Sequence, residues 1–171
     1  MKKIKSLVIG LGQSGFDLDL DPKRKIIWTH CKAINKHKNL DLCGAIDSDH
    51  SKGFHIKKKF KDKVLFSSNL EECLNEIKPE FISICTPTNT HLDLVKKLSK
   101  FKGIKYIFCE KPLGTNTKEA QEIISLCKES KIILATNYMR RWDKKYLWIK
   151  DKIESKSLGN LISINAYGTT A

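Results

Sequence analysis

Short apolar runs alternate along the chain with segments in which apolar residues recur every three or four positions. The runs are residues 4–9, 40–46, 64–66, 81–85, 106–109 and 132–135. Their apolar and β-branched composition is typical of buried parallel strands, whereas the intervening periodicity is that of amphipathic helices. Strands that alternate with helices indicate an α/β fold, a doubly wound parallel sheet with helices on both faces.

Helix starts and apolar stripes support this reading. Asn69 with Glu72, and Asn116 with Glu119, have the spacing of an N-terminal cap and its partner. The second pair precedes a stripe that we expect to face the core. The predicted stripes are Ala120, Ile123, Ile124 and Cys127; Ile27, Cys31 and Ile34; and Leu92, Val95 and Leu98.

The pattern changes after about residue 137. Trp142, Tyr146, Ile149 and Ile153 fit one face of a helix. Residues 161–167 alternate between apolar and polar, which predicts a strand of a half-exposed sheet. The remaining 171 − 137 = 34 residues are too few for an independent domain. We therefore expect one α/β domain over 1–137 and, over 138–171, a linker helix and the start of an incomplete second domain.

The charge of the chain suggests nucleic acid, but its distribution argues against it. The net charge is +13, and Arg24, Arg140 and Arg141 are the only arginines among 32 basic residues, which leaves 29 lysines. Lysines spread along the chain favour a solvated basic surface, because specific phosphate and base recognition prefers arginine. A nucleic-acid binder is the weakest hypothesis, and it predicts a steeply salt-dependent affinity. No apolar run approaches the roughly 20 residues of a membrane helix.

Six cysteines show no CxxC pair and no Cys/His spacing of a zinc site, so we expect no metal. Four of them, Cys43, Cys85, Cys109 and Cys127, lie in apolar stretches, where a free thiol behaves as a small hydrophobic group. The N-terminal Met-Lys-Lys-Ile-Lys is unlike a signal peptide, because glycines interrupt the following apolar run. Buried thiols and no signal peptide predict a cytoplasmic location.

A glycine-rich turn follows the first apolar run directly, with the sequence Gly10-Leu11-Gly12-Gln13-Ser14-Gly15. In a dinucleotide-binding turn the first glycine permits the bend and the second lets the backbone approach a pyrophosphate. The third permits close packing of helix on strand, and the helix N-terminus supplies amide donors. We take all six residues as candidates for cofactor binding. A plain tight turn is the alternative, and flavin and methyl-donor proteins also use glycine-rich turns here.

Asp47 ends the second run, where a carboxylate can bind the adenosine ribose and repel a 2′-phosphate. It lies 47 − 15 = 32 residues after Gly15, whereas about 20 is usual. The Asp-rich stretch 16–25 resembles an inserted loop that accounts for the excess. Asp47 favours NAD, although the nearby Lys52 and Lys57 leave NADP possible. A solvated aspartate in a turn is the alternative.

Two further motifs follow strands at the sheet edge where α/β proteins bind ligands. The first is Thr86-Pro87-Thr88-Asn89-Thr90-His91, of which Thr86, Pro87, Asn89 and His91 are candidates for cofactor binding. His91 by itself is more typical of a helix start. The second is Cys109-Glu110-Lys111-Pro112, in which Lys111 can donate to a substrate hydroxyl and stabilise the alkoxide as hydride leaves. Glu110 is expected to hold that ammonium or a ribose.

These motifs and Asn137-Tyr138-Met139-Arg140-Arg141-Trp142 occur in an order that resembles the glucose–fructose oxidoreductase/inositol dehydrogenase/MocA (Gfo/Idh/MocA) family. The resemblance covers essentially the whole chain, and Glu-Lys-Pro after a strand is its most specific part. It implies an NAD(P)-dependent oxidoreductase acting on sugars, sugar nucleotides or polyols. It also implies a Rossmann domain followed by an open, mainly antiparallel α+β sheet domain.

The resemblance implies a role for each motif. Lys111 is the catalytic lysine beside nicotinamide and substrate. Glu110, Pro112 and the loop 86–91 line the cofactor, and Arg140 lies near the nicotinamide end. The family's general base, a His paired with an Asp, belongs to the second domain and has no counterpart in this sequence. The chain is therefore expected to bind NAD and to lack the base, and to form homo-oligomers only with a complete second domain. A non-catalytic nucleotide-binding module is the alternative hypothesis.

Overall fold

The computed structural model describes residues 2–168, and its contacts divide the chain into two compact units, Met1–Asn137 and Tyr138–Ala171. Among the described residues, every helix is too short or too polar to span a bilayer.

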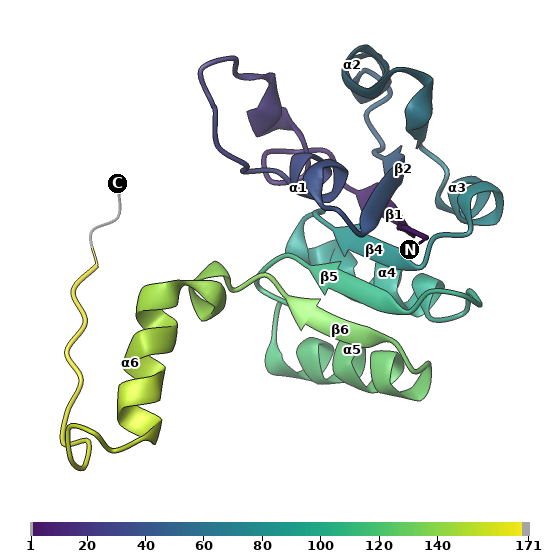
Figure 1. Cartoon of the computed structure of the whole chain (residues 1–171). Helices are drawn as coiled ribbons and strands as arrows, with labels where there is room; N and C mark the ends of the chain where they lie inside the picture. The colour runs from purple at the N-terminus through teal and green to yellow at the C-terminus, as the bar shows by residue number, and fades with distance from the viewer. Residues whose placement is uncertain (1, 169–171) are drawn as a thin grey trace. The chain divides into compact units, whose positions relative to one another are not determined.

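The first unit is built on a six-stranded parallel sheet in the order β3-β2-β1-β4-β5-β6 (Figure 1). The strands are β1 (Ile4–Ile9), β2 (Leu40–Ile46), β3 (Leu65–Ser67), β4 (Phe81–Ile84), β5 (Tyr106–Cys109) and β6 (Ile133–Thr136). This order reverses direction between β1 and β4, and ligands of doubly wound sheets bind beyond the strand ends at such a point. The α/β parallel-sheet prediction is confirmed.

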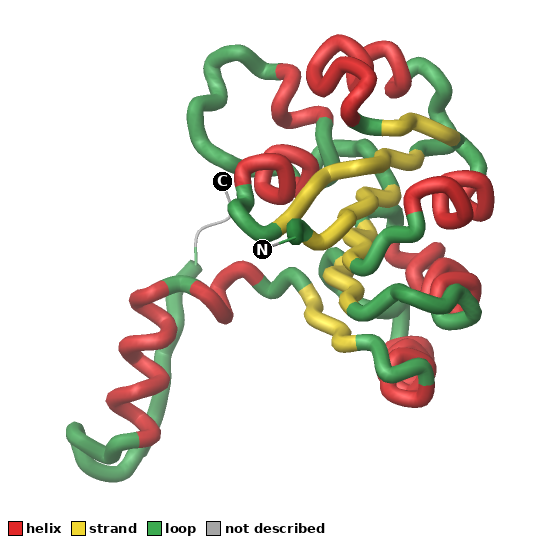
Figure 2. Tube along the Cα trace, turned by 45° about the vertical axis from the view of Figure 1, so that its right-hand side comes forward, coloured by secondary structure: helices red, strands yellow, loops and turns green. Residues whose placement is uncertain are grey.

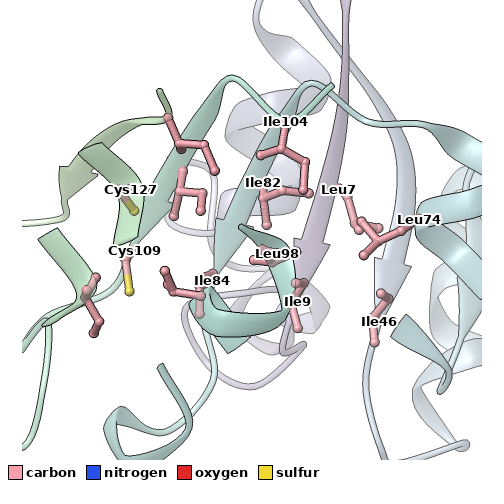
Figure 3. Packing of buried hydrophobic residues seen from close by; sticks show 14 of the residues in the cluster. Leu7, Ile9, Ile46, Leu74, Ile82, Ile84, Leu98, Ile104, Cys109 and Cys127 are labelled. Carbon is pink, nitrogen blue, oxygen red and sulfur yellow. The ribbon is translucent and has the colours of Figure 1, made fainter. Parts of the chain in front are cut away.

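Helices cover both faces of the sheet (Figure 2). They are α1 (His30–Lys36), α2 (Lys52–Phe60), α3 (Leu70–Ile77), α4 (His91–Leu98) and α5 (Thr117–Glu129), with short 3-10 turns η1 (Asp17–Leu20), η2 (Lys61–Lys63) and η3 (Thr88–Thr90). Residues of α1 and α2 pack in one buried cluster, and residues of α3, α4 and α5 in the other. Figure 3 shows the second cluster, in which the aliphatic side chains of the central strands meet Leu74 and Leu98.

The two predicted helix starts are confirmed in detail. The Asn69 side chain accepts hydrogen bonds from the amides of Glu71 and Glu72. At α5, Asn116 accepts from the Glu119 amide at 3.0 Å, and the Glu119 carboxylate accepts from Thr115 N at 2.8 Å. One residue of the predicted stripe is wrong, because Ile124 is 52% exposed. It lies beside Ile123, which is fully buried and faces the sheet.

The loop predicted over residues 16–25 is an insertion, and it extends to Thr29. The amides of His30 and Cys31 donate to the carbonyls of Ser14 (2.9 Å) and Gly15 (3.1 Å). In space, α1 therefore continues directly from the glycine turn, and residues 16–29 leave the helix and return to it. The predicted helix position of Ile27 is wrong for this reason: α1 begins at His30, and Ile27 is 51% exposed in the insertion.

The ends of this insertion are tied down by charged and polar contacts. Lys52 on α2 holds both carboxylate oxygens of Asp17 at 2.6 and 2.5 Å. The Thr29 hydroxyl donates to the buried Asp19, whose other oxygen lies 3.6 Å from Lys32 Nζ. These contacts order the loop next to the glycine turn.

The second unit contains η4 (Met139–Trp142) and α6 (Lys144–Glu154), with Asp143 as the α6 N-cap. Trp142 therefore precedes the helix rather than joining its face. The strand predicted over 161–167 is wrong, because that segment has no regular structure and Ile162 is 97% exposed. A strand requires a partner for its backbone groups, and residues 138–168 offer none.

Candidate functional site

A groove of ≈ 760 Å³ opens beyond the carboxyl ends of β1, β2 and β4, at the point where the strand order reverses. Its lining residues are Ile9, Gly10, Gly12, Ile46, Asp47, Ser48, Cys85, Thr86, Pro87, Thr90 and Leu94. Predicted candidates from three separate motifs thus meet in one groove. Thr90 belongs to the loop 86–91 that the resemblance places beside the cofactor. The lining residues that were not predicted are Ile9, Ile46, Ser48, Cys85 and Leu94, and each lies within a few residues of a predicted candidate.

The three glycines of the turn differ in the space around their Cβ positions. Gly10 has φ +88°, and a Cβ atom there would lie 2.7 Å from the Cys85 carbonyl carbon. A Cβ on Gly15 would overlap the carbonyl oxygen of Gly10. Gly12 has no atom within 4 Å of its Cβ position and lines the groove. Two glycines are therefore required by packing, while the third leaves the backbone open to a ligand.

The other residues of the turn serve mainly to hold it. Leu11 is fully buried in the cluster beneath α1 and α2. The Ser14 carbonyl accepts the first amide of α1. Gln13 is exposed, and neither it nor Ser14 is among the residues that line the groove.

Asp47 lies at the end of β2 and contacts the glycine turn. Its Oδ2 accepts a hydrogen bond from Leu11 N at 2.6 Å, and its Oδ1 accepts from Asp49 N at 2.9 Å. The structure brings Asp47 and the glycine turn together. The 14-residue insertion 16–29 increases their separation in sequence but not their separation in space. Without it the separation from Gly15 is 32 − 14 = 18 residues, close to the usual value of about 20.

The loop after β4 contributes small polar groups. The Thr90 hydroxyl lies 2.7 Å from the Pro87 carbonyl, to which it donates, and 2.6 Å from the Thr86 hydroxyl, and these two contacts fix the turn against the groove. Cys85 adds a sulfur that stays neutral, since burial raises the pKa of its thiol far above the usual range. Asn89 is exposed and does not line the groove.

His91 is fully buried, and the structure does not bring it to the groove. Its Nδ1 lies 3.2 Å from the Leu113 carbonyl oxygen, and its Nε2 lies 3.0 Å from that of Thr86. The ring thus links the loop after β4 to the loop after β5. His91 is also the first residue of α4, the place that its position in the sequence favours.

Glu110 differs from the expectation that it holds the Lys111 ammonium. Its Oε1 accepts from His30 Nε2 at 2.9 Å and from Asn137 Nδ2 at 2.8 Å. Its Oε2 accepts from the Lys111 backbone amide at 3.2 Å. The ammonium half of the expectation is wrong, because the His30 ring and the Asn137 amide occupy Oε1 and the Lys111 backbone amide occupies Oε2. A bond from Glu110 to a ribose stays a prediction. His30 was missed, since its place beside the glycine turn depends on the insertion.

The remaining candidates lie at the rim or outside the first unit. Lys111 and Pro112 are exposed after β5, and the peptide between them is cis. Arg140 belongs to η4 in the second unit.

The hydrogen bonds to Glu110 predict a pH dependence of stability. Burial raises the pKa of Glu110. The hydrogen bonds from the His30 ring, the Asn137 amide and the Lys111 backbone amide, together with the electrostatic interaction with His30, outweigh burial and lower this pKa from 4.5 to about 2. A lowered carboxylate pKa stabilises the fold above the unfolded value and loses this contribution as pH falls through the folded value. Compared with Glu110→Gln, the native chain should therefore lose on the order of 2–3 kcal/mol of stability between about pH 4.5 and 2.

Urea unfolding of both proteins between pH 7 and 2.5 measures this difference. Other carboxylates titrate in both proteins, so their contributions cancel. A stability difference that stays constant over the whole range would contradict the role given to Glu110.

A family model described as an oxidoreductase family with an NAD-binding Rossmann fold matches residues 25–138, about two thirds of the chain. The match includes Asp47, the loop after β4 and Glu110-Lys111-Pro112, and it begins after the glycine turn. A myo-inositol 2-dehydrogenase from Thermotoga maritima is 31% identical over 104 residues, 61% of this chain and 28% of the relative. An uncharacterized oxidoreductase from Schizosaccharomyces pombe is 33% identical over 104 residues, with the same two shares.

Solved structures show the same fold. A myo-inositol 2-dehydrogenase from Lactobacillus plantarum has a TM-score of 0.75 at 24% identity and is matched over 94% of this chain and 44% of its own length. The WlbA dehydrogenase from Chromobacterium violaceum, in complex with NADH and UDP-GlcNAcA, has a TM-score of 0.76 at 18% identity, over 93% and 42%. The chain thus spans less than half the length of these relatives.

Proposed function

The chain belongs to the Gfo/Idh/MocA oxidoreductase family and carries its NAD-binding Rossmann domain, and from this membership we propose that it serves hydride transfer between a nicotinamide cofactor and a hydroxyl of a sugar, sugar nucleotide or polyol. The observation that carries the proposal is the groove at the strand-order reversal, in which Gly12 leaves the backbone open and Asp47 stands beside the glycine turn. A dinucleotide needs both features.

The residues present fit the cofactor in three places. The open backbone at Gly12 suits the pyrophosphate, and the Asp47 carboxylate suits the hydroxyls of the adenosine ribose. Thr86 and Pro87 then lie on the path toward the nicotinamide, with Lys111 at the same edge of the sheet. The nicotinamide, when bound, accepts or donates the hydride.

Lys111 acts on the substrate in this proposal. Its ammonium donates a hydrogen bond to the reacting hydroxyl and stabilises the negative charge that develops on oxygen as hydride leaves. The proton acceptor has no counterpart among the residues of this site. Relatives that are inositol dehydrogenases favour a polyol as substrate, and the neighbour solved with UDP-GlcNAcA supports sugar nucleotides as the second choice.

Turnover separates this proposal from a non-catalytic nucleotide-binding module. The test is NAD⁺ reduction by myo-inositol, by free sugars and by UDP-sugars, measured on the complete polypeptide that the reading frame encodes. Hydride transfer to NAD⁺ supports the proposal, and NADH binding without turnover of any of these classes favours the module. A cytoplasmic location is part of the proposal, and all six cysteines are free thiols, as a reducing compartment keeps them.

We expect Asp47 to select NAD over NADP. Its carboxylate repels a 2′-phosphate, and Lys52, one of the two lysines that could attract one, is already paired with Asp17. Asp47→Asn keeps an acceptor for the Leu11 amide and removes the charge. The ratio of the NADPH and NADH dissociation constants should therefore fall about tenfold.

Fluorescence titration with NADH and NADPH measures this ratio. Asp49→Asn is the matched control, because it removes a carboxylate two residues away that does not line the groove. An unchanged ratio in Asp47→Asn, or an equal change in both variants, would show that Asp47 is not the selector.

A further inference from the structure

We propose that His30 and Asn137 are positioning residues that fix Lys111 through the Glu110 carboxylate. The proposal rests on the proposed function, because it gives Lys111 its place beside the cofactor. It concerns two residues that do not line the groove and whose side chains hydrogen-bond Glu110. They act on the turn that carries the lysine.

The two oxygens of Glu110 have separate partners. Oε1 accepts from His30 Nε2 (2.9 Å) and Asn137 Nδ2 (2.8 Å), which anchors the carboxylate from two sides. Oε2 accepts from the backbone amide of Lys111 (3.2 Å). The anchored carboxylate thereby restrains the peptide that leads into Lys111. A carboxylate with only 15% of its side chain exposed is held firmly enough to do this.

His30 connects this carboxylate to the glycine turn. Its amide donates to the Ser14 carbonyl at 2.9 Å, so the residue starts α1 where the turn ends. Its ring Nδ1 lies 2.5 Å from the hydroxyl of buried Ser83, and the ring packs on Phe108 with centroids 5.3 Å apart. Because the carboxylate can only accept, Nε2 carries the hydrogen. The ring is thus fixed on three sides.

Asn137 completes the anchor from the far side of β5. Its backbone amide donates to the Cys109 carbonyl at 2.8 Å, one residue before Glu110. The side chain then reaches Oε1 of the same glutamate. The glycine turn, the end of β5 and the end of β6 are joined at one oxygen atom, and the position of Lys111 depends on all three.

Glu110→Gln is the most informative variant, because the side chain keeps its shape while only one of its two terminal atoms can still accept a hydrogen bond. If the amide oxygen faces His30 and Asn137, the NH₂ group meets the Lys111 amide, donor against donor. If it faces Lys111, the NH₂ group meets the donors of His30 and Asn137. In both orientations the restraint weakens, and we expect the Lys111 amide to exchange with solvent about tenfold faster.

Amide hydrogen exchange by NMR on the ¹⁵N-labelled chain measures this change. Glu119→Gln is the matched control, because Glu119 likewise accepts from a backbone amide, that of Thr115. Because one amide oxygen suffices for that bond, Glu119→Gln should leave the exchange rate of the Lys111 amide unchanged. Asn137→Ala, which leaves His30 intact, serves as a second variant and should also speed exchange at Lys111. Unchanged exchange at Lys111 in Glu110→Gln and Asn137→Ala, or faster exchange across the whole sheet, would overturn the proposal.

A second readout links the restraint to the cofactor. Reductive ¹³C-methylation gives each lysine its own NMR signal, and NADH should shift the Lys111 signal in the native chain. In Glu110→Gln, at equal saturation with NADH, this shift should be at most half as large; an equal shift would count against the positioning role. If NADH does not bind the native chain, the proposed function fails, whereas the exchange comparison at Lys111 still decides the hydrogen-bond arrangement.

Discussion

Gly12→Val should abolish measurable NADH binding while leaving the fold intact. Nothing lies within 4 Å of the Cβ position at Gly12, and its φ is not positive, so a side chain is accommodated without strain. The same side chain projects into the groove at the place where a pyrophosphate must approach the backbone. We expect the dissociation constant of NADH to rise at least about a hundredfold, and the melting temperature to change little.

Gly168→Val is the matched control for this variant. Gly168 also has open space at its Cβ position and no positive φ, and it lies in the second unit. It should leave NADH affinity unchanged. NADH binding by Gly12→Val within a few fold of the native chain would show that the cofactor does not approach this turn.

Gly10→Ala, unlike Gly12→Val, should destabilise the fold. Its φ of +88° is unfavourable for a residue with a side chain, and the new Cβ would lie 2.7 Å from the carbonyl carbon of Cys85. Backbone cannot move aside there without separating β1 from β4 at the centre of the sheet. Strain and overlap together should cost about 3 kcal/mol, which lowers the melting temperature by about 10 °C.

Thermal unfolding followed by circular dichroism tests this difference, with Gly12→Ala as the reference. A Gly10→Ala protein as stable as Gly12→Ala would contradict the close approach of the two strands. The Gly10 and Gly12 variants together distinguish the role of the turn in folding from its role in cofactor binding.

The sheet and the starts of α3 and α5 were predictable because their causes are local. Each strand of the first unit is a short apolar run, and Asn69 and Asn116 cap helices through residues two or three positions away. The groove was predictable in part for the same reason. Motifs that directly follow parallel strands must meet at one edge of the sheet, whatever separates them in sequence.

The features that sequence reasoning missed depend on distant partners. The hydrogen bond between His30 and Glu110 joins residues 80 positions apart in the sequence, and no local pattern near either residue predicts it. The insertion 16–29 separates the glycine turn from α1 in the sequence, although α1 follows the turn directly in space. The alternation of 161–167 was a sound local pattern, but a strand also needs a neighbour, and the described residues 138–168 supply none.

Calorimetric titration of the native chain with NADH tests the central claim most directly. The groove at the reversal of the strand order, with its open glycine and its aspartate, predicts saturable binding at one site per chain. Competition by NAD⁺ and loss of the heat signal in Gly12→Val complete the expected result. Absence of saturable heat at millimolar NADH, or equal binding by Gly12→Val, would contradict the assignment of this groove to the cofactor.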